Sequence, residues 1–224
     1  MSRDAAGRWH ISVLCEATVA DGPATEAAVG LDAGITSLLT LSTGEKISNP
    51  RHERRDRARL VKAQRELSRT VKGSANRARA RVKVARVHAR ITDRRTDHLH
   101  KLSTRIIREN QTVIIEDLSV RNMVRNHSLA RAISDTSWAE LRRLLEYKAG
   151  WYGRTVIAVD RWYPSSKTCS ACGQLAASMP LNVRQWTCAS CGAAHDRDVN
   201  AAKVIRAAGL AVQACGDGVR PARA

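Results

Sequence analysis

A chain of 224 residues can bury a core of its own, and a net charge of +17 indicates a polyanionic partner, most often nucleic acid. No apolar run approaches the length of a membrane span, and the N-terminus lacks a signal-peptide pattern. These features exclude a membrane partner and predict a cytoplasmic protein. Six cysteines in that compartment indicate metal binding rather than disulfides. The composition does not predict an oligomeric state.

The first fifty residues carry strand patterns. Arg8–Ala20 alternates polar and apolar residues and is expected to form one strand. Ala27–Gly44, with the sequence AAVGLDAGITSLLTLSTG, predicts two strands joined as a hairpin, and Ser42–Gly44 predicts a turn.

A basic segment with helical spacing follows, and a helical hairpin is expected over residues 50–110. KGSAN, at Lys72–Asn76, predicts the break between its two helices. From Arg51 to Glu109 there are 20 Lys and Arg against six Asp and Glu, a net of +14 out of the chain's +17. A solvated helix face, the alternative reading, would intersperse more acids. The charge therefore favours contact with nucleic acid.

Two short apolar runs in the second half of the chain predict buried strands. They are TVIIEDL, at Thr112–Leu118, and RTVIAVD, at Arg154–Asp160. Between them Ser137 and Glu140 have the spacing of a capping box, which predicts a helix through about Ala149.

The C-terminal region predicts one more helix, from Asp196 to about Ala208, followed by a disordered tail at 211–224. The expected order is three strands, helices, and then strands alternating with helices. This is the order of an RNase H-like fold, an α/β arrangement with a mixed sheet.

Four cysteines form two C-x-x-C pairs, CSAC and CASC, separated by fifteen residues. Two short knuckles with this spacing can present four thiolates tetrahedrally to one Zn²⁺. A thioredoxin-like redox pair is the alternative, but two matched pairs disfavour it. Four thiolates leave no open coordination position, so a structural zinc is expected on Cys169, Cys172, Cys188 and Cys191.

Three acids have suggestive positions: Asp32 on a strand between glycines, Glu116 at a strand end, and Asp198 in a helix beginning beside the second knuckle. Each has a structural alternative, respectively a turn former, a solvated strand end and a helix-capping acid. In an RNase H-like sheet the three would meet at one end. Such carboxylate clusters hold two Mg²⁺ or Mn²⁺ for phosphodiester hydrolysis.

The segments VGLDAG, VIIEDL and HDRDVNAA resemble the three motifs of a RuvC-type nuclease. With PSSKTCSACG and WTCASCG between the second and third motifs, the chain resembles the TnpB family of RNA-guided DNA endonucleases encoded by insertion sequences. The resemblance implies a two-metal DNA endonuclease associated with transposition, with DNA and a guide RNA as partners. It implies catalytic, metal-binding roles for Asp32, Glu116 and Asp198. Asp117 and Asp196 are adjacent to the matching positions but do not occupy them.

The resemblance also implies a division of the chain. The expected parts are a remnant of an N-terminal RNA- and DNA-binding β domain (1–26), a RuvC-like core carrying the helical hairpin (27–164), a zinc ribbon (165–194), the last motif and helix (195–210), and the tail (211–224). TnpB-like proteins have a larger N-terminal region, so a truncated chain is expected.

Two other functions are kept as alternatives. A catalytically idle remnant acting as a nucleic-acid-binding protein would be expected to lose at least one acid, and none is lost. A basic zinc-ribbon protein of ribosomal type would explain the charge and the cysteines but leaves the three acids unexplained.

Overall fold

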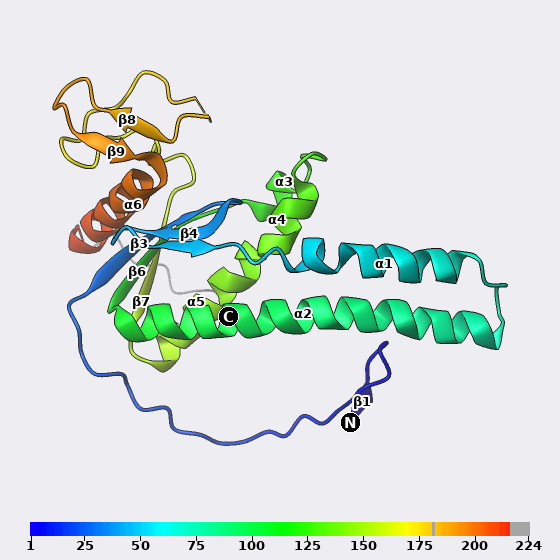
Figure 1. Cartoon of the computed structure of the whole chain (residues 1–224). Helices are drawn as coiled ribbons and strands as arrows, with labels where there is room; N and C mark the ends of the chain where they lie inside the picture. The colour runs from blue at the N-terminus through cyan, green and yellow to red at the C-terminus, as the bar shows by residue number, and fades with distance from the viewer. Residues whose placement is uncertain (181, 216–224) are drawn as a thin grey trace. The chain divides into compact units, whose positions relative to one another are not determined.

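The computed structural model describes residues 1–180 and 182–215, and the chain divides into two compact units (Figure 1). The first, called the hairpin unit, comprises Met1–Val19 and Arg51–Lys101. The second, called the sheet unit, comprises Ala20–Pro50 and the chain from Leu102 onward.

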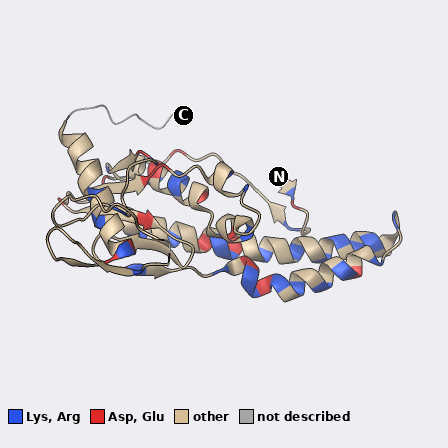
Figure 2. Ribbon diagram, turned by 90° about the horizontal axis from the view of Figure 1, so that it is seen from above, with Lys and Arg blue, Asp and Glu red and all other residues tan. Residues whose placement is uncertain are grey.

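The hairpin unit is built on two helices that lie side by side, α1 (His52–Ser68) and the first part of α2 (Ala75–Glu109). The predicted helices and the break between them are confirmed. Gly73 makes the turn with a φ of 83°, a conformation that favours glycine. An ion pair of 2.7 Å joins Arg94 of α2 to the buried Asp56 of α1. Lys and Arg line both helices (Figure 2).

The predicted strand over Arg8–Ala20 is wrong for most of its length. Only Trp9–His10 forms a strand, β2, which pairs antiparallel with β1 (Ser2–Arg3). Residues 11–27 belong to no helix or strand, and Ile11 and Leu14 are exposed. Alternation marks which residues could share a face, but a strand also needs a neighbouring strand to accept its hydrogen bonds.

The sheet unit contains a five-stranded mixed sheet, so the predicted α/β class with a mixed sheet is confirmed. The strand order is β5-β4-β3-β6-β7. The strands are β3 (Ala28–Ala33), β4 (Ser37–Leu41), β5 (Lys46–Ser48), β6 (Thr112–Glu116) and β7 (Thr155–Val159). β3, β4 and β5 are antiparallel, whereas β3, β6 and β7 run parallel. The third strand of the meander is thus β5 and not the segment before β3.

Helices pack on both faces of this sheet. One face is covered by α6 (Arg197–Ala214), which contacts β3 more than any other element. On the other face a small cavity of about 50 Å³ is lined by Leu31 and Ile115 of the sheet and by Leu141 of α5 (Trp138–Trp151). The short helices α3 (Val120–Met123) and α4 (Ala130–Thr136) connect β6 to α5.

The helix predicted from Ser137 to about Ala149 is present as α5, but its cap differs from the prediction, and so does the end of the final helix. Ser137 precedes α5 with a left-handed φ of 53°, and its hydroxyl donates to the carbonyl of Ser134, so no capping box forms. The final helix continues past Ala208 to Ala214. Residues 211–214 of the predicted tail are therefore helical, and residues 216–224 lie outside the described residues.

The cysteine-containing module lies between β7 and α6. It includes an antiparallel pair of short strands, β8 (Gln185–Thr187) and β9 (Ala194–Asp196). Across residues 1–180 and 182–215, no helix combines the length and apolarity needed to cross a bilayer.

Candidate nuclease and metal sites

Asp32 and Glu116 are neighbours at the carboxyl ends of two parallel strands. The register pairs Leu31 of β3 with Ile115 of β6, and each acid follows one of these residues. Because side chains alternate along a strand, Asp32 shares a face with Gly30, and Glu116 shares that face with Ile114. Both carboxylates are thus directed to the face that α6 covers.

Two glycines bring α6 unusually close to the sheet. A Cβ on Gly30 would collide with the carbonyl oxygen of Ala202 and would lie 2.7 Å from the amide nitrogen of Arg206. A Cβ on Gly209 would collide with the side chain of Ile114. The close approach brings the first turn of α6, with Asp198, to the edge where β3 and β6 end.

The charges of Glu116 and Asp198 act on Asp32. The pKa of Asp32 is raised to about 8, mainly by burial and in addition by the negative charges of Glu116 and Asp198. Burial also raises the pKa of Glu116, and a hydrogen bond of 2.7 Å from the Ser165 hydroxyl opposes this shift. Metal-free, this cluster keeps a proton at neutral pH.

Two basic side chains lie near Asp198, the acid of the cluster that α6 carries. Lys46 Nζ lies 3.9 Å from one Asp198 oxygen, and Arg184 Nη1 lies 3.7 Å from the other. Among the described residues, the four cysteines form a group whose ligand atoms lie close enough together to hold a metal ion as they stand, and the three acids do not form such a group.

The two neighbouring acids have other partners. Asp117 accepts hydrogen bonds from Arg142, at 2.6 Å, and from Arg161, and the hydrogen bond from Arg142 is the main reason that its pKa is lowered. Asp196 is the N-cap of α6: it accepts from the Val199 amide at 3.1 Å and pairs with Lys46 at 2.7 Å. Both acids are thus engaged in contacts that hold loops and helix ends.

The sequence reasoning missed the groups that surround the acids. Ser165 is buried and bonds to Glu116, and its only signal was its place in the PSSK motif before the first knuckle. Lys46 was missed because β5 was not predicted, and Arg184 precedes a strand too short to show a pattern.

The four predicted cysteines come together. Each contributes a sulfur, and all four lie within 4.8 Å of one another, so the cluster could hold a zinc ion. The two knuckles fold alike: the Gly173 amide donates to the Cys169 carbonyl at 2.9 Å, and the Gly192 amide donates to the Cys188 carbonyl at 2.9 Å. Both glycines have positive φ, 76° and 71°. Cys15 and Cys215 are exposed and lie outside the cluster.

A buried asparagine joins the cysteine module to the helix that carries Asp198. The Asn200 side chain accepts from the Ser170 amide at 2.8 Å and donates to the Thr168 carbonyl at 2.7 Å. It is only 1% exposed. His195 Nε2 also lies 3.1 Å from the sulfur of Cys169. The start of α6 is therefore fixed from two sides, by the sheet and by the first knuckle.

Comparison with protein families gives two matches. The family OrfB_IS605, described as "Probable transposase", matches residues 10–127. The family Cas12f1-like, TNB domain, matches residues 138–205. The first match covers the hairpin, β3 to β6 and two of the three acids, and the second covers the cysteine module and the third.

Several curated relatives are similar over most of this chain. A Streptomyces pristinaespiralis protein named "Putative RNA-guided DNA endonuclease" is 70% identical over 223 residues, which is 100% of this chain and 55% of the relative. The Escherichia coli K12 protein named "Putative RNA-guided DNA endonuclease InsQ" is 37% identical over 97% of this chain and 58% of its own length. The chain thus spans a little over half the length of these relatives.

A solved structure shares the fold. The cryo-EM structure of the Cas12f1–sgRNA–target DNA complex contains a chain that matches with a TM-score of 0.57 and 19% sequence identity. The match covers 80% of this chain and 49% of that one.

Proposed function

Since the chain belongs to the OrfB_IS605 family of TnpB-like proteins, we propose that it is a metal-dependent DNA endonuclease with an RNase H-like, RuvC-type core. The observation that carries the proposal is the approach of Asp32, Glu116 and Asp198 from β3, β6 and α6, which adds to the effect of burial in raising the pKa of Asp32. Three neighbouring acids in a chain of net charge +17 suit a site for cations and a phosphodiester.

The donor set fits hard divalent cations. Asp32, Glu116 and Asp198 offer only carboxylate oxygens, which Mg²⁺ and Mn²⁺ prefer, and bound cations would favour the ionised form of Asp32, which burial and the other two acids disfavour. When bound, such ions supply an activated water and stabilise the leaving oxygen of a phosphodiester. Ser165 orients Glu116 through its hydrogen bond. The thiolates of the four cysteines suit zinc instead, in a structural role.

The partners follow from the relatives and from the charge. The relatives are named as RNA-guided DNA endonucleases, and we infer DNA and, for the whole protein, a guide RNA as partners of this chain. The hairpin unit offers a surface for their phosphates. A hollow of about 870 Å³ along α1 is lined mainly by cations, namely Arg54, Arg57, Lys62, Arg65 and Arg69.

The test of the nuclease proposal is cleavage of labelled single- and double-stranded DNA with and without Mg²⁺ or Mn²⁺. Asp32→Asn, Glu116→Gln and Asp198→Asn should each reduce the cleavage rate at least about a thousandfold, because each removes an anionic ligand worth several kcal/mol. All three variants keep the size of the side chain.

Asp117→Asn and Asp196→Asn are the matched controls and should retain cleavage. Asparagine preserves the N-cap of α6 at position 196, which alanine would not. If the three acid variants cleave like the parent, or if the parent shows no metal-dependent cleavage, the catalytic proposal fails. The second of these results would leave the idle nucleic-acid-binding protein as the function.

A further inference from the structure

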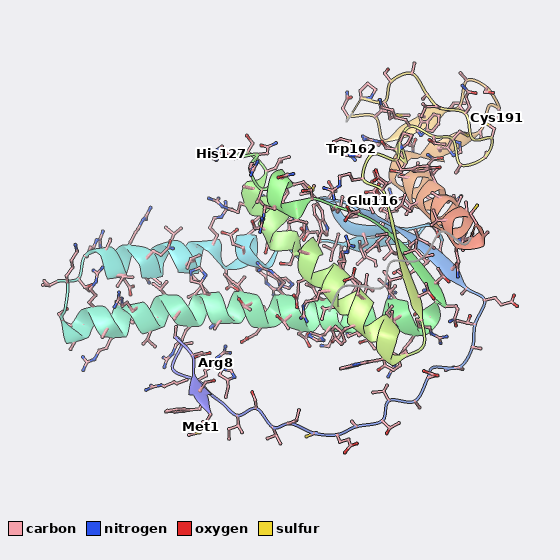
Figure 3. All side chains as sticks on the ribbon, turned by 180° about the vertical axis from the view of Figure 1, so that it is seen from behind. Met1, Arg8, Glu116, His127, Trp162 and Cys191 are labelled. Carbon is pink, nitrogen blue, oxygen red and sulfur yellow. The ribbon has the colours of Figure 1, made fainter. Side chains whose placement is uncertain are left out.

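The turn that follows β7 presents a tryptophan beside the carboxylate edge. Trp162 is 85% exposed and lies three residues beyond Val159, the register partner of Glu116. Three residues span at most about 10 Å. Figure 3 labels Trp162 and Glu116 at the same end of the sheet.

Among the described residues, Trp162 is the tryptophan that is neither buried nor in contact with another ring or a cation. Trp9 lies under the Arg3 guanidinium, and Trp151 packs edge-on against Tyr147. Trp186 packs against a histidine, and Trp138 is buried. Indole is the side chain with the largest flat apolar surface, so an open indole face beside a candidate active site is available for a ligand.

The turn that carries this indole is held rigidly. The Trp162 amide donates to the Asp160 side chain at 2.8 Å, and the Tyr163 amide donates to the Asp160 carbonyl at 3.0 Å. Arg161 is paired with Asp117, and Ser165 is bonded to Glu116. Because the backbone of the turn is already ordered, a ligand that stacks on the indole restricts only the two side-chain torsions of Trp162.

From these observations we propose that Trp162 is a stacking platform for an unpaired nucleobase next to the scissile phosphate. The inference rests on the proposed nuclease function and names how its substrate strand is held. Bases within a duplex are already stacked on one another, so only an unpaired base offers a free π-face. Lys46 and Arg184 beside Asp198 suit the strand's phosphates. Stacking tolerates any base, and the subsite therefore selects single strands without selecting sequence.

The experiment measures binding of a 12-residue oligothymidylate and of an abasic strand of equal length, without magnesium and at about 150 mM salt. Trp162→Ala should weaken binding of the oligothymidylate about 5- to 100-fold, the size expected for one stacked base. It should leave binding of the abasic strand unchanged, because phosphate contacts remain. Trp162→Phe should restore most of the loss. Trp151→Ala, which removes another half-exposed indole of the same unit, is the matched control and should bind like the parent.

Equal weakening on both strands, no weakening, or a parent that does not prefer the base-bearing strand would each overturn the stacking proposal. The measurement does not depend on cleavage. A chain that never cuts DNA but shows the base-dependent loss would contradict the proposed nuclease and leave the stacking subsite standing. If the chain cleaves DNA but Trp162→Ala binds the oligothymidylate like the parent, the nuclease proposal stands and the stacking proposal fails.

Discussion

The cysteine cluster and the carboxylate cluster are assembled in opposite ways, although α6 is attached to both. The four cysteines lie between Cys169 and Cys191, on two knuckles whose turns fold alike. The three acids are spread from Asp32 to Asp198 and meet only because β3, β6 and α6 pack together.

This difference decides what each cluster depends on. A local cluster of thiolates gains its stability from the ion that it binds, because little else orders so small a module. The carboxylate cluster does not stabilise its surroundings in this way. It is ordered by the core of the sheet unit, although burial and the neighbouring negative charges disfavour the ionised form of Asp32. We therefore expect the order of the cysteine cluster to depend on a bound ion and the order of the carboxylate cluster to depend on the packing of the sheet unit.

The largest expected effect is the loss of zinc from the local cluster. Cys172→Ser should reduce the zinc content from one ion per chain to well under one. About 10–16 kcal/mol of binding free energy is coupled to the folding of small structural zinc modules, so the module should unfold. Metal analysis and limited proteolysis measure this, with new cleavage expected within 165–194. Cys215→Ser, an exposed cysteine outside the cluster, should change neither. If Cys172→Ser kept its zinc, or if it became sensitive to proteolysis throughout the sheet unit, the two clusters would not differ in what they depend on.

A smaller effect is expected from the charge of the distributed cluster. The folded pKa of Asp32 is about 8 and the unfolded value is near 4, so the folded state holds an extra proton between these values. The stability that this proton provides is complete below about pH 4 and is lost as the pH rises toward 8. From pH 6 to pH 8.5 the parent, zinc-loaded and magnesium-free, should lose about 2–3 kcal/mol relative to Asp32→Asn.

Urea unfolding of both proteins across this pH range provides the measurement, and millimolar Mg²⁺ should reduce the difference at high pH. A difference between the parent and Asp32→Asn that stays constant from pH 6 to pH 8.5 would show that the pKa of Asp32 is not raised in the folded protein.

The link between the clusters should have an effect of intermediate size. Asn200→Ala removes two hydrogen bonds to the backbone of the first knuckle and leaves the Ser170 amide and the Thr168 carbonyl without that partner. A loss of about 2 kcal/mol in unfolding free energy is expected. Amide hydrogen exchange should increase in both the knuckle and the first turn of α6. Gln213→Ala, on the exposed end of the same helix, serves as the control. Faster exchange in the knuckle alone would mean that the clusters are independent.

The smallest expected effect concerns nucleic-acid affinity, which neither cluster should provide. Arg65→Ala removes one cation from the α1 hollow and should reduce the slope of log K against log salt by about 0.9 for duplex DNA, with a modest loss of affinity. Replacing Arg54, Lys62, Arg65 and Arg69 together by glutamate should lower the slope further. An unchanged slope would place the phosphate-binding surface elsewhere.

The elements that could be predicted are those whose signal is local. The α1–α2 hairpin, the β3–β4 hairpin and the cysteine spacing are patterns within a few dozen residues, and each is present. The strand at Arg8–Ala20 failed because a partner strand is not a property of the segment itself. The capping box failed because Ser137 has a left-handed backbone, which the spacing to Glu140 does not reveal.

The site shows the same division. The sequence motifs singled out Asp32, Glu116 and Asp198, but the groups that tune them lie on loops and on a three-residue strand. Ser165 reaches Glu116 across 49 positions of sequence, and Lys46 reaches Asp196 across 150. Contacts between residues this far apart in the sequence depend on the tertiary fold, which the periodicity of a single segment does not predict.

Gly30 has a consequence for how this protein tolerates mutation. It has no functional group, yet a single added methyl would push α6 off β3 and carry Asp198 away from Asp32. In a saturation screen scored by DNA cleavage, codon 30 should therefore be as intolerant as the three acidic codons, including to alanine. In a screen scored by soluble expression, it should tolerate small residues better than its cleavage profile implies. A position that sets a spacing between backbones would thus be inherited as strictly as one that performs chemistry.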